Sequence, residues 1–159
     1  MSLSHVDENG RARMVDVSGK PDTMRSATAR GQVRMSQTAF EAVMGNTVAK
    51  GDVLTVAQVS GITAAKRTGE LIPLCHPLGL DGVDVKVELE PGIPGVAIEA
   101  TARCTGKTGV EMEALTAVAV ACLTVYDMVK AIDRSMVIEH VRLISKTGGA
   151  HGDWRSAGE

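Results

Sequence analysis

The sequence predicts a single α+β domain in which helices cover one face of an antiparallel sheet. Apolar and polar residues alternate over 82–90 and again over 96–104, and a Pro/Gly-rich turn at 91–95 separates the two segments, which is the pattern of a β-hairpin with one buried face. Helical periodicity precedes and follows this hairpin. A chain of 159 residues can bury a core of its own but is too short for two ordinary domains.

Each remaining element has a local justification. Ser36 is a favoured N-cap residue, and Gly45 or Asn46 can end the helix that it starts. The segment 51–72 contains many β-branched residues, but its apolar positions 53, 56, 57, 64 and 65 have helical spacing, so we predict one helix there. The predicted elements in chain order are a strand at 31–36, a helix at 36–46, a helix at 51–72, the hairpin at 82–104, a helix at 110–132 and a strand at 135–149.

The long helix predicted from Val110 to about Ile132 has two unlike faces. At 100° per residue, one face carries the apolar residues expected against the core: Leu115, Val118, Cys122, Val125, Val129 and Ile132. The opposite face mixes small, apolar and charged residues: Glu113, Thr116, Val120, Thr124, Asp127 and Lys130. Small residues allow another backbone to approach closely, so we expect the outer face to lie against a second subunit or a ligand.

The composition argues against several classes of function. A formal net charge of -2 without Lys/Arg blocks, and only three aromatic residues, make nucleic acid a poor partner. The N-terminus lacks the apolar core of a signal peptide, and no run of eighteen apolar residues occurs, so we expect a cytoplasmic protein without a membrane span. Three cysteines without C-x-x-C spacing indicate neither a disulfide framework nor a zinc ribbon.

Two further expectations follow from composition. The polar, Gly-rich ends at 1–13 and 148–159 are expected to be flexible, which leaves about 14–149 as the ordered fold. A core with few aromatic rings must gain its buried area through close packing of backbones and small side chains, so we predict tight helix packing and an oligomer.

Asp127 and Lys130 lie three residues apart on the predicted helix and therefore share a face. A surface ion pair is the simpler interpretation of this spacing. The small residues around the pair favour partial desolvation instead, which shifts pKa values and suits acid–base chemistry. The spacing leaves both interpretations open.

The stretch LIPLCHPL at 71–78 places Cys75 and His76 between two prolines, which exclude regular helix. Adjacent side chains of an extended segment point to opposite sides, so the two residues are poorly placed to ligate one metal ion. A simple turn and a rigid loop that presents His76 to a planar substrate both remain open. The TGKTG at 105–109 lacks the first glycine of a P-loop, but its backbone N–H groups and Lys107 could still hold a phosphate.

Five motifs match those of one enzyme family in their order and spacing: MVDVSGK at 14–20, KGDV at 50–53, AAKRTGELIPLCHPL at 64–78, TGKTGVEMEALTA at 105–117 and YDMVKA at 126–131. The chain resembles the cyclic pyranopterin monophosphate synthases, the molybdenum cofactor biosynthesis protein C family. The resemblance implies a ferredoxin-like protomer and a homohexamer, a trimer of dimers with active sites at the dimer interface. It also implies conversion of 3′,8-cyclo-7,8-dihydroguanosine 5′-triphosphate into cyclic pyranopterin monophosphate, with release of pyrophosphate.

The resemblance further implies roles for individual residues. The implied catalytic residues are Asp127, Lys130 and Lys50. The implied substrate contacts are Leu74, Cys75, His76, Met112, Glu113 and Glu111, with Asp16, Arg25 and Lys146 around the pocket. No metal site or resident cofactor is implied, although Mg²⁺ can accompany the triphosphate. Two other classes stay open: a nucleotide-binding protein without catalytic activity, and a metal-dependent hydrolase that uses Cys75 and His76.

Overall fold

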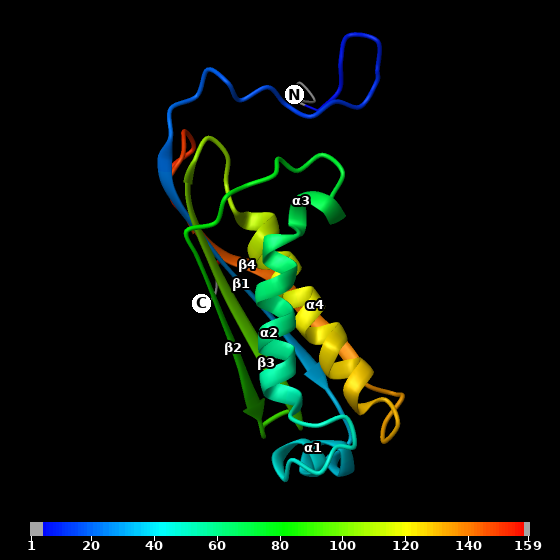
Figure 1. The fold of residues 1–159 in the computed structure, drawn as a ribbon. Coiled ribbons are helices and arrows are strands. Elements are labelled where there is room, and N and C mark those ends of the chain that lie inside the picture. Colours follow the sequence, from blue (N-terminus) through cyan, green and yellow to red (C-terminus); the bar gives the residue numbers. More distant parts are fainter. Residues whose placement is uncertain (1–4, 158–159) are drawn as a thin grey trace.

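The computed structural model of the chain describes residues 5–157, which form one antiparallel sheet with helices on it (Figure 1). The strand order is β2-β3-β1-β4-β5, and every neighbouring pair is antiparallel. The elements are β1 (Thr23–Arg34), α1 (Gln37–Met44), α2 (Val53–Lys66), α3 (Thr68–Leu71), β2 (Gly82–Glu90), β3 (Gly95–Gly106), α4 (Glu111–Val129), β4 (Val137–Thr147) and β5 (Trp154–Arg155). The predicted α+β class and its ferredoxin-like topology are confirmed.

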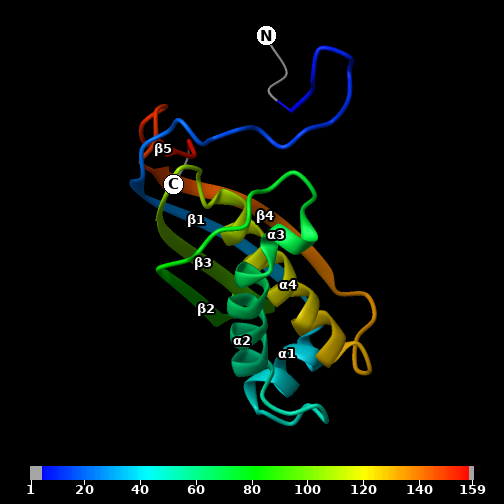
Figure 2. The same cartoon turned by 45° about the horizontal axis from the view of Figure 1, so that its top comes forward.

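Helices α2 and α4 lie side by side on the same face of the sheet, as Figures 1 and 2 both show. Their contact is close because small residues meet there. A Cβ atom added to Gly61 of α2 would lie 3.1 Å from the Ala117 carbonyl oxygen of α4, and one added to Gly31 of β1 would lie 2.7 Å from a Val118 methyl carbon. The tight helix packing expected from the scarcity of aromatic residues is therefore confirmed.

Several predicted elements match the structure. The hairpin is β2 and β3, with Val85 and Ile98 on its buried face. Helix α1 begins after Ser36, whose hydroxyl oxygen accepts a hydrogen bond from the Ala39 N–H at 3.2 Å, and Gly45 is its C-cap. On α4, the predicted core stripe is fully buried at four of its positions: Val118, Cys122, Val125 and Val129.

Other boundaries were wrong. The strand predicted at 31–36 is the end of a strand that begins at Thr23, because its first half contains few β-branched residues and gave no strand signal. The helix predicted at 51–72 is interrupted at Arg67, which separates α2 from α3. Ile132, which was predicted in the core stripe of the long helix, is 42% exposed. The short strand β5 had no sequence signal.

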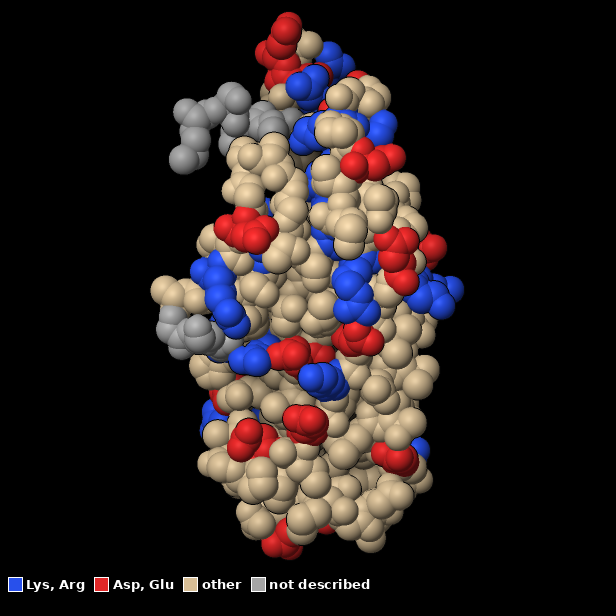
Figure 3. All heavy atoms as spheres, turned by 90° about the vertical axis from the view of Figure 1, so that its left-hand side faces the viewer, with Lys and Arg blue, Asp and Glu red and all other residues tan. Residues whose placement is uncertain are grey.

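Helix α4 is long and apolar enough to satisfy the length and hydropathy criteria for a membrane span, and it is the one such helix within residues 5–157. Half of its apolar stretch is buried inside the protein, because α4 packs on β1, β3 and β4 and on α2. Its hydropathy therefore reflects its place in the core. On the face drawn in Figure 3, basic and acidic side chains are interspersed, and no extended patch of one sign appears.

Candidate active site

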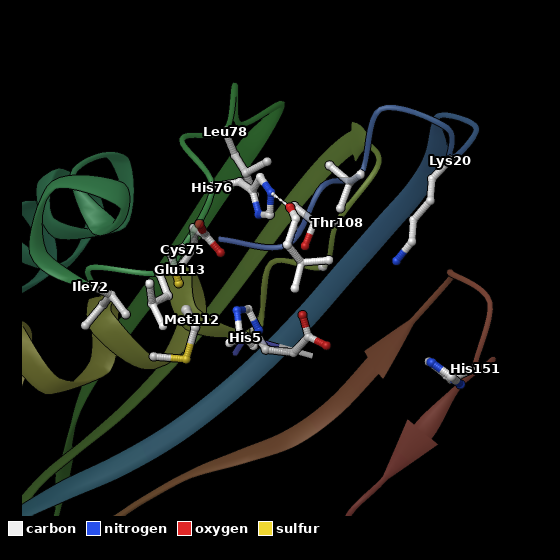
Figure 4. A pocket seen from close by; sticks show the side chains of 15 residues that line it. His5, Lys20, Ile72, Cys75, His76, Leu78, Thr108, Met112, Glu113 and His151 are labelled. Atoms are coloured by element: carbon white, nitrogen blue, oxygen red, sulfur yellow. Dashed lines mark hydrogen bonds between the residues drawn. The ribbon is translucent and has the colours of Figure 1, made fainter. Parts of the chain in front are cut away.

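A cavity of about 660 Å³ opens near the N-terminus of α4 (Figure 4). Its volume lies within the range of small-molecule sites. Three segments form most of its wall: the N-terminal segment before β1, the loop after α3, and the turn that leads into α4. The lining residues are His5, Val15, Val17, Lys20, Ile72, Leu74, Cys75, His76, Leu78, Thr108, Gly109, Glu111, Met112, Glu113 and His151.

The loop after α3 holds His76 in a fixed orientation. Pro73 and Pro77 restrict its backbone, and the Cys75 N–H donates to the Ile72 carbonyl oxygen at 3.1 Å. The His76 Nε2 lies 2.7 Å from the Val15 carbonyl oxygen, so Nε2 carries the proton and donates it to this bond. His76 is thus held by the backbone of a segment sixty-one residues away in the sequence.

Glu113 is the most buried charged residue of the cavity wall, with 3% of its surface exposed. Burial raises the pKa of its carboxyl group; its own backbone N–H opposes this rise, and the charge of Glu111 adds to it. No ion pair to Glu113 is found among the described residues. Burial, followed by the charge of Glu113, raises the pKa of the neighbouring Cys75 thiol. This part of the wall therefore favours protonated side chains.

Glu111, at the start of α4, has the opposite electrostatic surroundings. Burial opposes its ionisation, but the hydrogen bond from Lys146 at 2.8 Å, its own backbone N–H and the positive charges of Lys146 and Arg25 outweigh burial and lower its pKa. The structure thus joins Lys146, predicted from the family resemblance, to the wall through Glu111.

Arg25 and Asp16 lie beside the cavity and do not line it. The Arg25 guanidinium donates to the carbonyl oxygens of Gly106 and Lys107 at 3.0 and 3.3 Å, which fixes the TGKTG turn against β1. Hydrogen bonds from Ser18 lower the pKa of Asp16, with smaller contributions from the charges of Lys107 and His76. Asp16 is exposed.

The three predicted catalytic residues form a second cluster. The Lys50 Nζ lies 2.6 Å from Asp127 Oδ2 and the Lys130 Nζ lies 2.7 Å from Asp127 Oδ1. Hydrogen bonds from Lys130 and then Lys50 lower the pKa of Asp127 to about 2. Each of the three side chains is about half exposed in the single chain, so the desolvation expected for the Asp127–Lys130 pair is absent there.

The two clusters lie at opposite ends of α4. Glu113 is in its first turn and Asp127 in its last. Fourteen residues of α-helix separate them, which corresponds to about 21 Å at 1.5 Å per residue. The cavity residues and the Lys50–Asp127–Lys130 cluster therefore do not meet within one chain.

Sequence reasoning missed several residues of the cavity wall. Lys20 ends the MVDVSGK motif and had a signal, since a lysine in a polar motif is a candidate anion ligand. Thr108 also lies in a quoted motif. His5 and His151 lie in segments that were expected to be flexible, and no local pattern marks them. Only the path of the chain brings these ends to the cavity.

Within residues 5–157, no group of three or more His, Cys, Asp and Glu side chains is arranged to hold a metal ion. Cys75 and His76 lack further ligands of these types. The sequence profile of the MoaC family matches residues 14–149, which include the Lys50–Asp127–Lys130 cluster and all residues of the cavity wall except His5 and His151. The chain belongs to the MoaC family.

Curated members of the MoaC family are similar to the chain over almost its whole length. It is 58% identical over 153 residues to the cyclic pyranopterin monophosphate synthase of Desulfitobacterium hafniense, covering 96% of this chain and 93% of the relative. The enzyme of the same name from Heliobacterium modesticaldum is 58% identical over 152 residues and 96% of both chains. That of Pelotomaculum thermopropionicum is 57% identical over 157 residues, 99% of this chain and 92% of the relative.

Proposed function

We propose that the protein is a cyclic pyranopterin monophosphate synthase, a phosphorus–oxygen lyase of molybdenum cofactor biosynthesis. It converts 3′,8-cyclo-7,8-dihydroguanosine 5′-triphosphate into cyclic pyranopterin monophosphate and pyrophosphate. The observation that carries this proposal is the near-full-length identity of 57–58% to relatives of that name. The contacts of Lys50 and Lys130 with Asp127 support it, because a protein that only binds a nucleotide needs no such cluster.

The cavity is proposed to hold the guanine-derived ring. Leu74, Cys75 and Met112 supply apolar contacts, while His76 and Glu113 supply polar groups that orient a planar heterocycle. Glu111 belongs to the same wall.

The triphosphate is proposed to lie toward the cationic rim of the cavity. Arg25 and Lys146 are its proposed donors, and the guanidinium of Arg25 is suited to bind two phosphate oxygens at once. Asp16 lies in the same region. We propose no resident cofactor, and comparing turnover with and without a chelator tests whether Mg²⁺ accompanies the triphosphate.

Asp127, Lys50 and Lys130 are proposed to move the protons. Opening and reclosing the purine-derived ring requires proton transfers among ring nitrogens and a hydrated carbon, which an Asp–Lys cluster can relay. In the cyclisation, a ribose-derived hydroxyl oxygen forms a bond to the α-phosphorus while the bond to the pyrophosphate oxygen breaks. The hydroxyl gives up its proton, and cationic side chains stabilise the charge that develops on the phosphate oxygens.

A complete site is proposed to need two copies of the chain, because one chain separates the two clusters by about 21 Å. A two-fold axis near the middle of α4, at Val120, would place Glu113 of each copy opposite Asp127 of the other. The two packed helices expose apolar residues that suit such a contact: Leu123 on α4, and Val56 and Val59 on α2. The proposed assembly is a homohexamer, a trimer of these dimers, in the cytoplasm.

The proposal is tested by incubating the purified protein with the cyclised dihydroguanosine triphosphate. Release of pyrophosphate together with formation of the cyclic pyranopterin supports it. Binding of the substrate without either product would favour a non-catalytic nucleotide-binding protein. Absence of both binding and products would overturn the assignment.

A further inference from the structure

Residues 14–20, here termed the strap, cross one side of the cavity before the chain enters β1. Val15, Val17 and Lys20 of the strap line the cavity directly. Two walls frame the site, the loop after α3 and the TGKTG turn, and the strap passes over the end of the molecule at which both lie (Figures 1 and 2). Access to the cavity therefore depends on where the strap lies.

Two hydrogen bonds attach the strap to the rest of the described chain, one to each wall. His76 Nε2 donates to the Val15 carbonyl oxygen at 2.7 Å. Lys107 Nζ donates to the Ser18 carbonyl oxygen at 2.9 Å. Both acceptors are backbone carbonyls, so these bonds fix the path of the strap and do not depend on which side chains it carries.

The strap is also folded locally. The Ser18 N–H donates to Asp16 Oδ1 at 2.9 Å, and the Lys20 N–H donates to the Val17 carbonyl oxygen at 3.0 Å. These two bonds form a tight turn at Ser18, the residue that Lys107 binds. A turn held at one point moves as a unit when that point is released.

The Nζ of Lys107 is therefore engaged by the strap. Among the described residues, its one hydrogen-bond acceptor is the Ser18 carbonyl oxygen. Its backbone carbonyl accepts from Arg25, which fixes the base of the side chain. Lys107 thus has a firm anchor at one end and the strap at the other.

We propose that Lys107 is a positioning residue, whose ammonium group holds the strap across the cavity and so places Lys20 and Asp16 for substrate binding. The expected effect of Lys107 on turnover rests on the proposed function. Its expected effect on the position of the strap does not. His76 is the second attachment point. Lys107 lies in the turn before α4, at the opposite end of this helix from the Lys50–Asp127–Lys130 cluster. Its loss should therefore weaken substrate binding more than the chemical step.

The test compares Lys107→Met, which keeps the length of the stem and removes the donor, with Lys107→Arg, which keeps a donor. Lys86→Met, at an exposed position on β2, is the matched control. Hydrogen–deuterium exchange of residues 14–20 is measured without substrate, and KM and kcat are measured with it. Thermal unfolding verifies that each variant is folded.

In Lys107→Met, exchange of the Ser18 and Lys20 amides should rise about fivefold to tenfold, the effect of one hydrogen bond of ordinary strength, because the bond from Lys107 to Ser18 is exposed to solvent. KM should rise by a similar factor while kcat stays within about twofold. Lys107→Arg should restore both values, and Lys86→Met should change neither.

Unchanged exchange in Lys107→Met would overturn the proposal. If KM rose without a change in exchange, Lys107 would contact the substrate directly, which also contradicts the positioning role. If the protein lacked synthase activity altogether, the exchange measurement would still decide the role of Lys107. The two proposals can therefore fail separately.

Discussion

Glu113 and Asp127 are acidic residues on the same helix, α4, yet the two ends of that helix surround them in opposite ways. Glu113 is 3% exposed, in the wall of a cavity, and has no ion-pair partner among the described residues. Asp127 is about half exposed and contacts two lysine ammonium groups. The surroundings of Glu113 therefore exclude most water, whereas those of Asp127 exclude little.

This difference separates the protonation behaviour of the two carboxyl groups. Burial raises the pKa of Glu113, whereas hydrogen bonds from Lys130 and Lys50 lower the pKa of Asp127 to about 2. The helix dipole favours an acidic residue in the first turn and disfavours one in the last, so Asp127 depends on its lysines for compensation. One helix thus carries a carboxyl group whose pKa is raised and another whose pKa is lowered.

The largest expected effect comes from the Lys50–Asp127–Lys130 cluster at the C-terminal end of α4. Asp127→Asn removes the anion that both lysines bind, and Lys50→Ala removes one of the two cations. If this cluster moves protons, each change should lower kcat by about 10²–10⁴-fold, the range for loss of a general acid or base. Steady-state turnover of the cyclised dihydroguanosine triphosphate is the measurement.

Asp84→Asn is the matched control for this experiment. Asp84 is also exposed and paired with a basic group, since the Arg103 Nη2 lies 2.6 Å from its carboxylate. It lies on β2, away from both clusters, and its substitution should leave kcat unchanged. Full turnover in both Asp127→Asn and Lys50→Ala, in protein of unchanged assembly, would show that the cluster has no catalytic role.

The second prediction concerns whether Glu113 of one subunit and Asp127 of another form one site across a dimer interface. Asp127→Asn and Glu113→Gln, which we each expect to have low activity alone, are mixed in equal amounts, unfolded together and refolded. In a mixed dimer one site carries both substitutions and the other carries neither, so random pairing should restore about one quarter of the wild-type sites. No recovery in mixed dimers would mean that each site lies within one chain.

The sequence predicts contacts between residues that are close in the chain better than contacts between distant ones. The Asp127–Lys130 contact follows from helical spacing alone, and the Ser36 cap from the residue type. The family resemblance implied a catalytic role for Lys50, but nothing in the sequence predicted its contact with Asp127, which spans seventy-seven residues. Nothing in local periodicity specifies which loop packs beside the end of a helix.

The strap shows the same limit more clearly. Its motif was recognised, but its hydrogen bonds to His76 and Lys107 span sixty-one and eighty-nine residues. Lys107 was interpreted as a possible phosphate ligand because glycine-rich turns before helices often bind anions. In the structure, its ammonium group donates a hydrogen bond to the Ser18 carbonyl oxygen, and this contact depends on the path of residues 14–20.

A third expected effect is the contribution of buried Glu113, at the N-terminal end of α4, to the stability of the fold. Because the folded-state pKa of Glu113 is raised above its ordinary value of 4.5, folding favours the protonated form. The protein therefore loses stability as the pH rises through the unfolded-state and then the folded-state pKa. Glu113→Gln removes this loss, so at about pH 7 its Tm should exceed that of the wild type by roughly a few °C, the scale of a modest change in stability for a domain of this size.

Below about pH 4 the carboxyl group is protonated in both states, and the advantage of Glu113→Gln should disappear. Thermal unfolding across pH measures this. Glu41→Gln is the control, since Glu41 is exposed on α1. Equal advantages for Glu113→Gln at both pH values would mean that burial of the charge is not the cause.

The smallest effect is the stability change at the exposed end, and it separates catalytic from structural importance. The folded-state pKa of Asp127 is about 2, below its ordinary value of 3.8, so its pairing stabilises the fold above about pH 4 and this contribution is lost as the pH falls through about 2. Solvent and salt screen an exposed pair, so Asp127→Asn should lower Tm at about pH 7 by less than about 2 °C. A larger fall in Tm would mean that the lysines hold the end of α4 together, and the loss of turnover in Asp127→Asn could then reflect a displaced helix end rather than a missing proton carrier.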